Sequence, residues 1–321
     1  MRYGAALAFS LAVAFGGTAS AQTWPAKLIK AIVPAGAGSA VDLIPRTVFE
    51  PLSAQLGVPI VVENRAGAGN IIGANAVARS EPDGYTILAN SSAHTITPWA
   101  FASVPYDTEK DFAAIIPLGN LPTVLIVSAE HGAKSLDELV SKAQAKPGSL
   151  NYASVGVATA THLSAERFRV SAGLQGAHIP FRGGPEALTE VIAGRVDFYF
   201  CPINTALPLI RDGKLRALAV STPKRASALP DVPTTLEAGF ANSDYTFWVG
   251  LFAPAKTPPE VIAKLHATTS EVLRNPALQQ KLSALGVEPM PMSPAAFEAY
   301  VRNEIASNAN LVKAAGIKVG Q

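Results

Sequence analysis

The chain has 321 residues, of which 49% are hydrophobic and 16% charged, and its formal net charge is +2. This length fits one large or two medium domains with a substantial core, and the composition excludes a disordered chain. No basic run or stripe stands out, so the sequence predicts no nucleic-acid partner.

Residues 1–21 have the pattern of a secretory signal peptide. Arg2 precedes an apolar stretch over residues 5–15, and residues 19–21 read A-S-A, an A-x-A cleavage signal. The apolar stretch is too short to span a bilayer. We therefore expect export of the chain and cleavage before Gln22.

Short apolar runs typical of strands alternate with amphipathic stretches. The predicted strands cover residues 28–34, 59–64, 85–90, 123–128, 150–154, 177–181, 196–200 and 215–221. Three helices carry clear N-terminal signals, with predicted caps at Ser135, Thr257 and Ser293, and the last is expected to end at Gly316. Strands that alternate with helices predict an α/β fold with mostly parallel sheets.

Two interruptions of this alternation predict two lobes joined by two crossing segments. One lies near Pro122 and the other in the proline-rich stretch at 223–233. The predicted first lobe comprises residues 22–122 and 226–321, and the predicted second lobe comprises residues 123–225.

The stretch "VPAGAGSAVD", residues 33–42, follows the first predicted strand. In open α/β sheets ligands bind beyond the carboxyl ends of the strands, and glycines such as Gly36 and Gly38 let a ligand approach the backbone. The N–H groups here can form an anion-binding concavity. We interpret Asp42 as a helix cap rather than a catalyst. The loop lacks both phosphate-binding glycine patterns, so a nucleotide is not expected.

A second loop of small residues, "VGVATATHL" at 155–163, follows the strand at 150–154. Gly156 permits close approach, and Thr159 is a predicted N-cap whose hydroxyl can also contact a ligand. His162 falls in the first helical turn. Two loops of one type, one in each lobe, can face each other and clamp a small molecule. Polar residues at other strand ends can line the same cleft: Ser91, Ser92, His94 and Asn204.

Catalytic and metal-binding patterns are not found in the sequence. There is no G-x-S-x-G motif, the five histidines are scattered, and no spacing suggests a metal site. The single cysteine, Cys201, lies in an apolar strand-like run and is expected to be a buried core thiol. The sequence thus predicts a protein that is not an enzyme and has no metal or cofactor.

Several motifs together resemble one known family. In order they are "VPAGAGSAVD", "VVENRAGAGN", "EPDGYTIL", "YASVGVATATHL", "HIPFRGG", "LRALAVS", "LPDVPTTLEAG" and "FAPAKTPPEVIAKL", behind a signal peptide. They are similar to the periplasmic substrate-binding proteins of tripartite tricarboxylate transporters, the Bug-type receptors. The resemblance covers essentially the whole chain after the signal peptide.

This resemblance implies a periplasmic receptor with the type II periplasmic-binding-protein fold. It implies a small organic mono- or dicarboxylate held between the lobes by backbone N–H groups, and delivery to the membrane subunits of a transporter. The implied contacts are Ala35, Gly36, Ala37, Gly38 and Ser39 in the first lobe, and Gly156, Val157, Ala158 and Thr159 in the second. Nothing in the sequence demands a dimer, so we expect a monomer.

Both loops depart from the family pattern. The first usually resembles V-P-F-x-x-G-G-x-x-D, and here Ala35 replaces the aromatic residue while Ser39 replaces the second glycine. In the second loop Ala158 replaces a glycine. The loss of an aromatic ring at 35 leads to the hypothesis that the pocket accepts a bulkier or aromatic carboxylate.

Two alternatives stay open on the sequence alone. One is an exported hydrolase that uses the same cleft, with a nucleophile next to His94 or His162. The other is a sensory receptor that reports its ligand to a membrane kinase, which would use the same binding physics.

Overall fold

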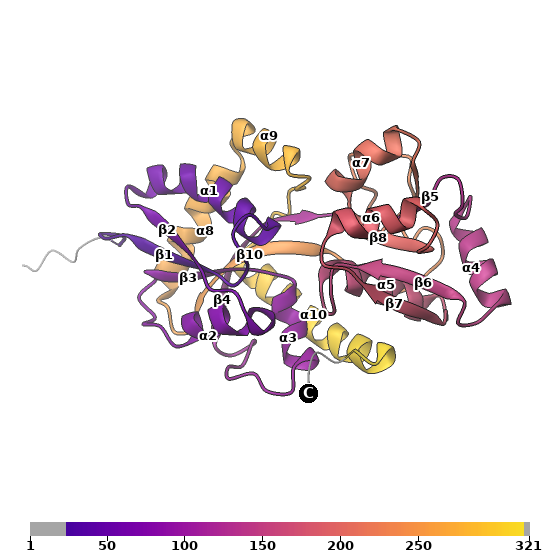
Figure 1. The fold of residues 1–321 in the computed structure, drawn as a ribbon. Coiled ribbons are helices and arrows are strands. Elements are labelled where there is room, and N and C mark those ends of the chain that lie inside the picture. Colours follow the sequence, from indigo (N-terminus) through magenta and orange to yellow (C-terminus); the bar gives the residue numbers. More distant parts are fainter. Residues whose placement is uncertain (1–23, 318–321) are drawn as a thin grey trace, which may run out of the picture.

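The computed structural model describes residues 24–317, which form two lobes that lie side by side (Figure 1). Each lobe contains one five-stranded sheet with helices packed against it, in the strand orders β2-β1-β3-β10-β4 and β7-β6-β8-β5-β9. The predicted two-lobed α/β fold is confirmed. The predicted signal peptide, residues 1–21, lies outside the described residues. Between residues 24 and 317 no helix combines the length and the apolar character needed to cross a membrane.

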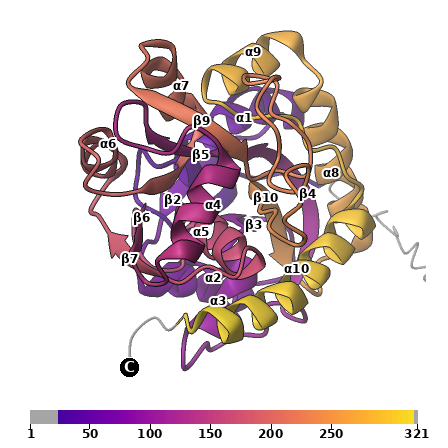
Figure 2. The ribbon, with the colours of Figure 1, turned by 90° about the vertical axis from the view of Figure 1, so that its right-hand side faces the viewer.

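The first lobe is built from two stretches of chain. The first stretch contains β1 (Ile29–Val33), α1 (Ala40–Leu56), β2 (Ile60–Asn64), η1 (Ala68–Asn70), α2 (Ile71–Ala78), β3 (Thr86–Ser91), α3 (Ala93–Ala100) and β4 (Phe112–Leu121). The second stretch returns with β10 (Phe247–Pro254), α8 (Pro259–Leu273), α9 (Pro276–Ala284) and α10 (Pro294–Ala315). Figure 2 shows α10 lying alongside α3, which it contacts.

The second lobe is one stretch of chain between the two crossings. It contains β5 (Thr123–Ser128), α4 (Leu136–Ala145), β6 (Leu150–Ser154), α5 (Ala160–Ser171), β7 (Gly176–Pro180), α6 (Gly184–Ile192), β8 (Phe198–Pro202), α7 (Ile203–Arg211) and β9 (Leu215–Val220). Apolar residues of these helices and strands form a separate core on each face of the sheet.

The first crossing fixes how the two sheets face each other. β1, β2 and β3 are mutually parallel, and β10 is antiparallel to both β3 and β4, so β4 ends at the same edge as β1 to β3. From Leu121 the chain passes through Pro122 alone into β5, which is antiparallel to β8, while β6, β7 and β8 are parallel. The carboxyl edge of each sheet therefore faces the other lobe.

The pattern of apolar runs missed two strands, β4 and β10, which lie side by side in the first sheet. Pro117 and Gly119 lie within β4, and Gly250 lies within β10. The pairing of the two strands shifts register twice, between Val249 and Gly250 and between Leu251 and Phe252. Such irregular pairing accommodates proline and glycine, which usually argue against a strand.

The predicted helix ends are confirmed at two of three helices. The Ser135 side chain caps α4, and the Ser293 side chain caps α10, which ends before Gly316 in a left-handed conformation. The predicted cap at Thr257 is wrong: α8 begins at Pro259, and the Thr257 hydroxyl is buried without a partner among the described residues. The two consecutive prolines shift the helix start by one residue.

The segment after β9 packs on the second lobe. Ala226, Leu229 and Val232 lie against one core of the second lobe, and Ala238 and Phe240 lie against the other. The division predicted from the sequence instead places every residue from 226 onward in the first lobe. We therefore propose that the second crossing lies close to the start of β10 rather than at residue 225.

Candidate functional site

The loop after β1 is a tight turn that runs directly into α1. Ser39 N–H donates to Gly36 O at 3.2 Å, and Gly38 has a φ of +81°. Ser39 is the N-cap residue, with φ −72° and ψ 162°, but its side chain makes no capping bond. The left-handed conformation at 38 is one that glycine adopts without strain.

Asp42 holds this first turn in place from inside the helix. Gly38 N–H donates to Asp42 Oδ2 at 2.9 Å, while Arg46 Nε and Asn64 Nδ2 both donate to Asp42 Oδ1 at 2.8 Å. Burial by itself would raise the pKa of Asp42, but these hydrogen bonds and the Arg46 charge lower it below its ordinary value. The structural role predicted for Asp42 is therefore met, although the N-cap position belongs to Ser39.

The loop after β6 has a similar geometry. Thr159 N–H donates to Gly156 O at 3.4 Å, and Ala158 has a φ of +60°. Thr159 is the N-cap residue of α5, with φ −76° and ψ 163°. Residues 36–42 and 156–162 thus share this bond and the left-handed third residue. They differ in that Gly156 has a φ of +124° where Gly36 has no positive φ, and that Asp42 N–H, unlike its counterpart at 162, bonds back to the N-cap residue, Ser39. Ala158 holds a left-handed conformation that costs about 1–2 kcal/mol for a residue with a Cβ.

His162 takes the place of Asp42 in the second turn. Ala158 N–H donates to His162 Nδ1 at 3.1 Å. Burial, and then the neighbouring His178, lower the pKa of His162 to about 4, so the ring is neutral at neutral pH and its Nδ1 can accept. The two rings stack with centroids 4.0 Å apart, and His178 Nε2 lies 2.6 Å from the Ser154 hydroxyl.

Both turns leave the same three backbone N–H groups without a partner among residues 24–317. They belong to Ala37, Ala40 and Val41 in the first turn and to Val157, Ala160 and Thr161 in the second. These groups sit at the N-termini of α1 and α5, where the helix dipole favours a negative ligand. The site therefore offers two matched sets of donors for an anion.

The second turn lies at the boundary between the lobes. Ala158 and Ala160 pack in a cluster with Ile96 of α3 and with Phe101, which follows α3. The Phe101 ring also fills the space where a side chain at Gly69 would stand, in the loop that follows β2. The second turn therefore touches first-lobe elements at the same sheet edge as the first turn.

Two polar side-chain groups at this edge lack a partner among residues 24–317: the hydroxyl of Ser39, which is a predicted contact, and the Nδ2 of Asn90, which the sequence reasoning missed. Ser39 Oγ is buried and has no partner among the described residues, whereas its counterpart Thr159 donates to Gly156 O at 2.7 Å. Asn90, at the end of β3, is fully buried and its Nδ2 is also without a partner in that range. No sequence signal distinguishes these groups, because the absence of a partner depends on the packing.

Three candidates beside β3 are corrected by the structure. His94 is 1% exposed and lies among Tyr106, Phe112 and Phe252, so it belongs to the core and faces no cleft. Ser92 is also buried, with its hydroxyl 2.7 Å from that of Tyr245.

The neighbouring Ser91 is buried as well, and its hydroxyl accepts from Ala93 N–H. The sequence placed these polar residues near a strand end but carried no information on which side faces the core.

Asn204 differs from its predicted role, and so does the Thr159 hydroxyl, although Thr159 occupies the N-cap position as predicted. Asn204 Nδ2 donates to Leu285 O at 3.0 Å, so this amide joins the second lobe to the first instead of pointing freely into the cleft. The Thr159 hydroxyl is engaged with Gly156 O and lies 3.1 Å from the Thr161 hydroxyl. Both the hydroxyl and the N–H of Thr159 are therefore engaged within the turn.

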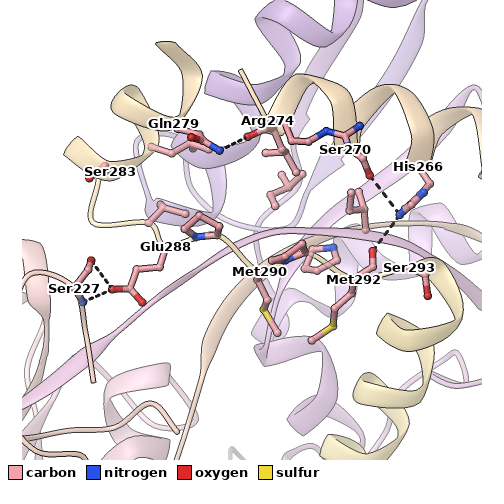
Figure 3. Close-up of a pocket in the computed structure, with 18 residues that line it drawn as sticks. Ser227, His266, Ser270, Arg274, Gln279, Ser283, Glu288, Met290, Met292 and Ser293 are labelled. Atoms are coloured by element: carbon pink, nitrogen blue, oxygen red, sulfur yellow. Dashed lines mark hydrogen bonds between the residues drawn. The ribbon is translucent and has the colours of Figure 1, made fainter. Parts of the chain in front are cut away.

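A cavity of about 600 Å³ lies away from both turns, between β4, α8, α9 and the segment 287–293 (Figure 3). Apolar side chains dominate its wall, including Leu282, Met290 and Met292. Of the residues that line it, Ser227 alone comes from the stretch of chain that packs with the second lobe. None of its lining residues comes from residues 35–42 or 155–162. A ligand in this cavity would therefore not be held between the two turns.

Metal and thiol chemistry find no support among residues 24–317. No group of three or more histidine, cysteine, aspartate or glutamate side chains is placed to hold a metal ion. Cys201 is buried in β8, as predicted, and burial raises the pKa of its thiol. A reactive cysteine needs the opposite environment, exposed and electropositive.

The comparison with known proteins decides the family. Residues 44–317 match the family described as "Tripartite tricarboxylate transporter family receptor". The chain belongs to this family. Its members are substrate-binding receptors of periplasmic type rather than enzymes.

Individual relatives match along nearly the whole chain. BugT of Bordetella pertussis is 33% identical over 302 residues, which cover 94% of this chain and 93% of BugT. A solved R. palustris protein with adipate has 30% identity and a TM-score of 0.78, covering 92% of this chain and 100% of that one. MatC from Rhodopseudomonas palustris with bound malate has 30% identity and a TM-score of 0.74, covering 90% and 100%.

The matched turns predict opposite effects for two exchanges of glycine and alanine. Gly38→Ala places a Cβ on a left-handed residue and should lower the free energy of unfolding by about 1 kcal/mol. Ala158→Gly relieves the same strain and should raise it by up to about 1 kcal/mol, partly offset by the more flexible unfolded chain. Urea unfolding of both variants measures this, and a destabilised Ala158→Gly would contradict the assigned conformation.

The buried His94 predicts a loss of stability in acid. Burial lowers its pKa to about 3 in the folded protein, so only the unfolded chain takes up a proton as the pH falls below about 6.5. Between pH 7.5 and pH 5 this removes about 2 kcal/mol of stability, and His94→Leu should reduce the loss by that amount.

Urea unfolding at both pH values tests this, with Phe112→Leu as the matched control. This substitution disturbs the same cluster but leaves His94 in place and changes no titrating group. It should therefore lower the free energy of unfolding equally at both pH values. An unchanged acid dependence in His94→Leu would contradict the assignment.

Proposed function

We propose that the protein is a periplasmic receptor that binds a small organic carboxylate between its two lobes and delivers it to the membrane subunits of a tripartite tricarboxylate-type transporter. The observation that carries the proposal is the pair of matched turns with unpartnered N–H groups. Membership of the receptor family supports the transport role. The solved relatives with adipate and malate support a carboxylate as the ligand class.

The proposed ligand site consists of Ala35 to Ser39 in the first lobe and Gly156 to Thr159 in the second, extended to the first two helical residues of each lobe, 40–41 and 160–161. The two oxygens of one carboxylate accept hydrogen bonds from the N–H groups of one turn. The second lobe then closes over the ligand by a hinge motion. A dicarboxylate can place one anionic end on each turn. A monocarboxylate uses both turns around one end.

The energetics allow binding without an arginine in either turn. Micromolar affinity corresponds to about 8 kcal/mol, and a hydrogen bond to a charged group contributes roughly 1.5–3 kcal/mol. Six N–H groups therefore suffice even after the cost of ordering the ligand and closing the lobes. Because the donors are fixed by Asp42 and His162 before the ligand arrives, they need little reorganisation.

Apolar side chains at the same edges suit the carbon skeleton of an organic acid. Val157, in the second turn, is 40% exposed, and Ile72, which follows the loop after β2, is 53% exposed. Ala35 is small where the family pattern has an aromatic residue. We therefore propose that the ligand range includes acids with a bulky or aromatic body, and that the receptor acts as a monomer.

Thermal unfolding with a panel of organic acids tests the proposed function. We expect short aliphatic dicarboxylates, adipate, malate, benzoate and phthalate to include at least one acid that raises the melting temperature with the logarithm of its concentration. The acid should be recovered unchanged after incubation, as for a receptor. A panel without any stabilising acid would contradict the proposal. Hydrolysis of an added ester by the protein would contradict it as well.

Proline substitutions test the turns themselves. Ala40→Pro and Ala160→Pro each remove one unpartnered N–H at the first helical position, where proline is well tolerated, and the preceding residues already have extended backbones. Each should weaken binding of the stabilising acid by roughly ten- to a hundredfold in titration calorimetry, with the fold intact. Ala40→Ser and Ala160→Ser keep the N–H groups and serve as matched controls. Proline variants that bind as tightly as these controls would show that the N–H groups are not used.

A further inference from the structure

Besides the hydrogen bond from Arg167 Nη2 of α5 to Asn308 Oδ1 of α10 at 2.9 Å, two groups of contacts join the lobes, and they differ in character. One is an apolar cluster that includes Ile96 of α3, Leu163 of α5 and Leu311 of α10, all buried. The other consists of exposed hydrogen bonds between α7, the segment after β9 and the chain that follows α9. Exposed hydrogen bonds exchange with water at low net cost, whereas separating a buried apolar cluster exposes its whole surface. The exposed group is therefore suited to open and close.

Asn204, the second residue of α7, makes the first of these exposed contacts. Its Nδ2 donates to Leu285 O at 3.0 Å. A Cβ added at Gly286 would lie only 2.8 Å from the Asn204 Cβ. The chain after α9 thus approaches α7 as closely as a glycine permits, which makes the contact specific for this arrangement of the lobes.

Glu288 makes the second contact. Its Oε1 accepts from Ser227 N–H at 2.8 Å and from the Ser227 hydroxyl at 2.9 Å (Figure 3). Ser227 follows Ala226, which is buried in a core of the second lobe. The backbone of Glu288 pairs in both directions with Asn120 at the end of β4, next to the first crossing. Glu288 therefore links the second lobe to the strand that leads into the hinge.

The segment that carries Glu288 has cavities on two sides. A cavity of about 600 Å³ and another of about 540 Å³ are both lined by Glu288, Pro289, Met290 and Met292. The segment is anchored by the buried Val287 and by the partly buried Met290 and Met292, which pack against cores of the first lobe. Glu288 lies between these anchors, and its hydrogen bonds to Asn120 and Ser227 fix its own position.

We propose that Asn204 and Glu288 form a latch that holds the lobes in the closed arrangement in which the two turns share a ligand. The latch comprises the bonds from Asn204 to Leu285 and from Ser227 to Glu288, and neither residue touches the ligand. It rests on the proposed function, since closure serves a receptor whose donors come from both lobes. A latch of this kind changes the affinity for every ligand by the same factor, because it acts on closure alone.

Small-angle X-ray scattering and binding kinetics of Asn204→Ala, Glu288→Ala and the double variant test the latch. We expect a larger radius of gyration of the free protein than in the wild type. Dissociation of adipate and malate should become faster by roughly two- to tenfold for each lost contact, by a similar factor for both acids. Asn310→Ala, an exposed amide on α10 without a side-chain hydrogen bond among the described residues, is the matched control and should behave as the wild type.

Two results would overturn the latch. The first is a double variant with the radius of gyration and dissociation rates of the wild type. The second is a loss in Asn204→Ala that is confined to one acid while Glu288→Ala has none, which would make Asn204 a ligand contact. If the wild type binds neither these nor any other acid of the panel, the proposed function fails, and the scattering of the free variants still decides the latch.

Discussion

A side chain in the first turn of a helix reaches back to a backbone N–H of the preceding loop, and both candidate binding turns depend on this interaction. Asp42 receives it from Gly38, and His162 receives it from Ala158. Each bond uses one N–H and fixes a left-handed residue, and three further N–H groups at equivalent positions of each turn have no partner among the described residues. A carboxylate and a neutral imidazole thus do the same structural work in the two lobes. The preorganised donors are what a receptor without a cationic side chain in either turn needs.

The chain path then brings the two turns to one boundary. Because one residue, Pro122, separates β4 from β5, the carboxyl edges of both sheets must face each other. The loops at these edges are the natural place for ligands in α/β folds. The same arrangement puts the start of α7 against the chain after α9, so the contacts that can regulate closure arise from the topology that builds the site.

Sequence reasoning located the two turns and the family but not the use of individual side chains. Small residues after apolar strands identify both loops, because those features are local. His94 and Asn204 were assigned to the cleft, yet one is buried by residues far along the chain and the other contacts the opposite lobe. Burial and contacts between lobes are set by the tertiary structure and cannot be predicted from the neighbouring residues in the sequence. The strands β4 and β10 were not predicted for a related reason, since only the irregular pairing between them accommodates Pro117 and Gly250.

The claim that two turns share one anionic ligand can be observed at the amides themselves. In ¹⁵N-labelled protein, addition of a bound organic acid should shift the amide proton signals of Ala40 and Val41 and those of Ala160 and Thr161 together, and should slow their exchange with solvent. The account predicts that both sets change with the same midpoint. Changes confined to one turn, or to residues around the cavity behind β4, would contradict it.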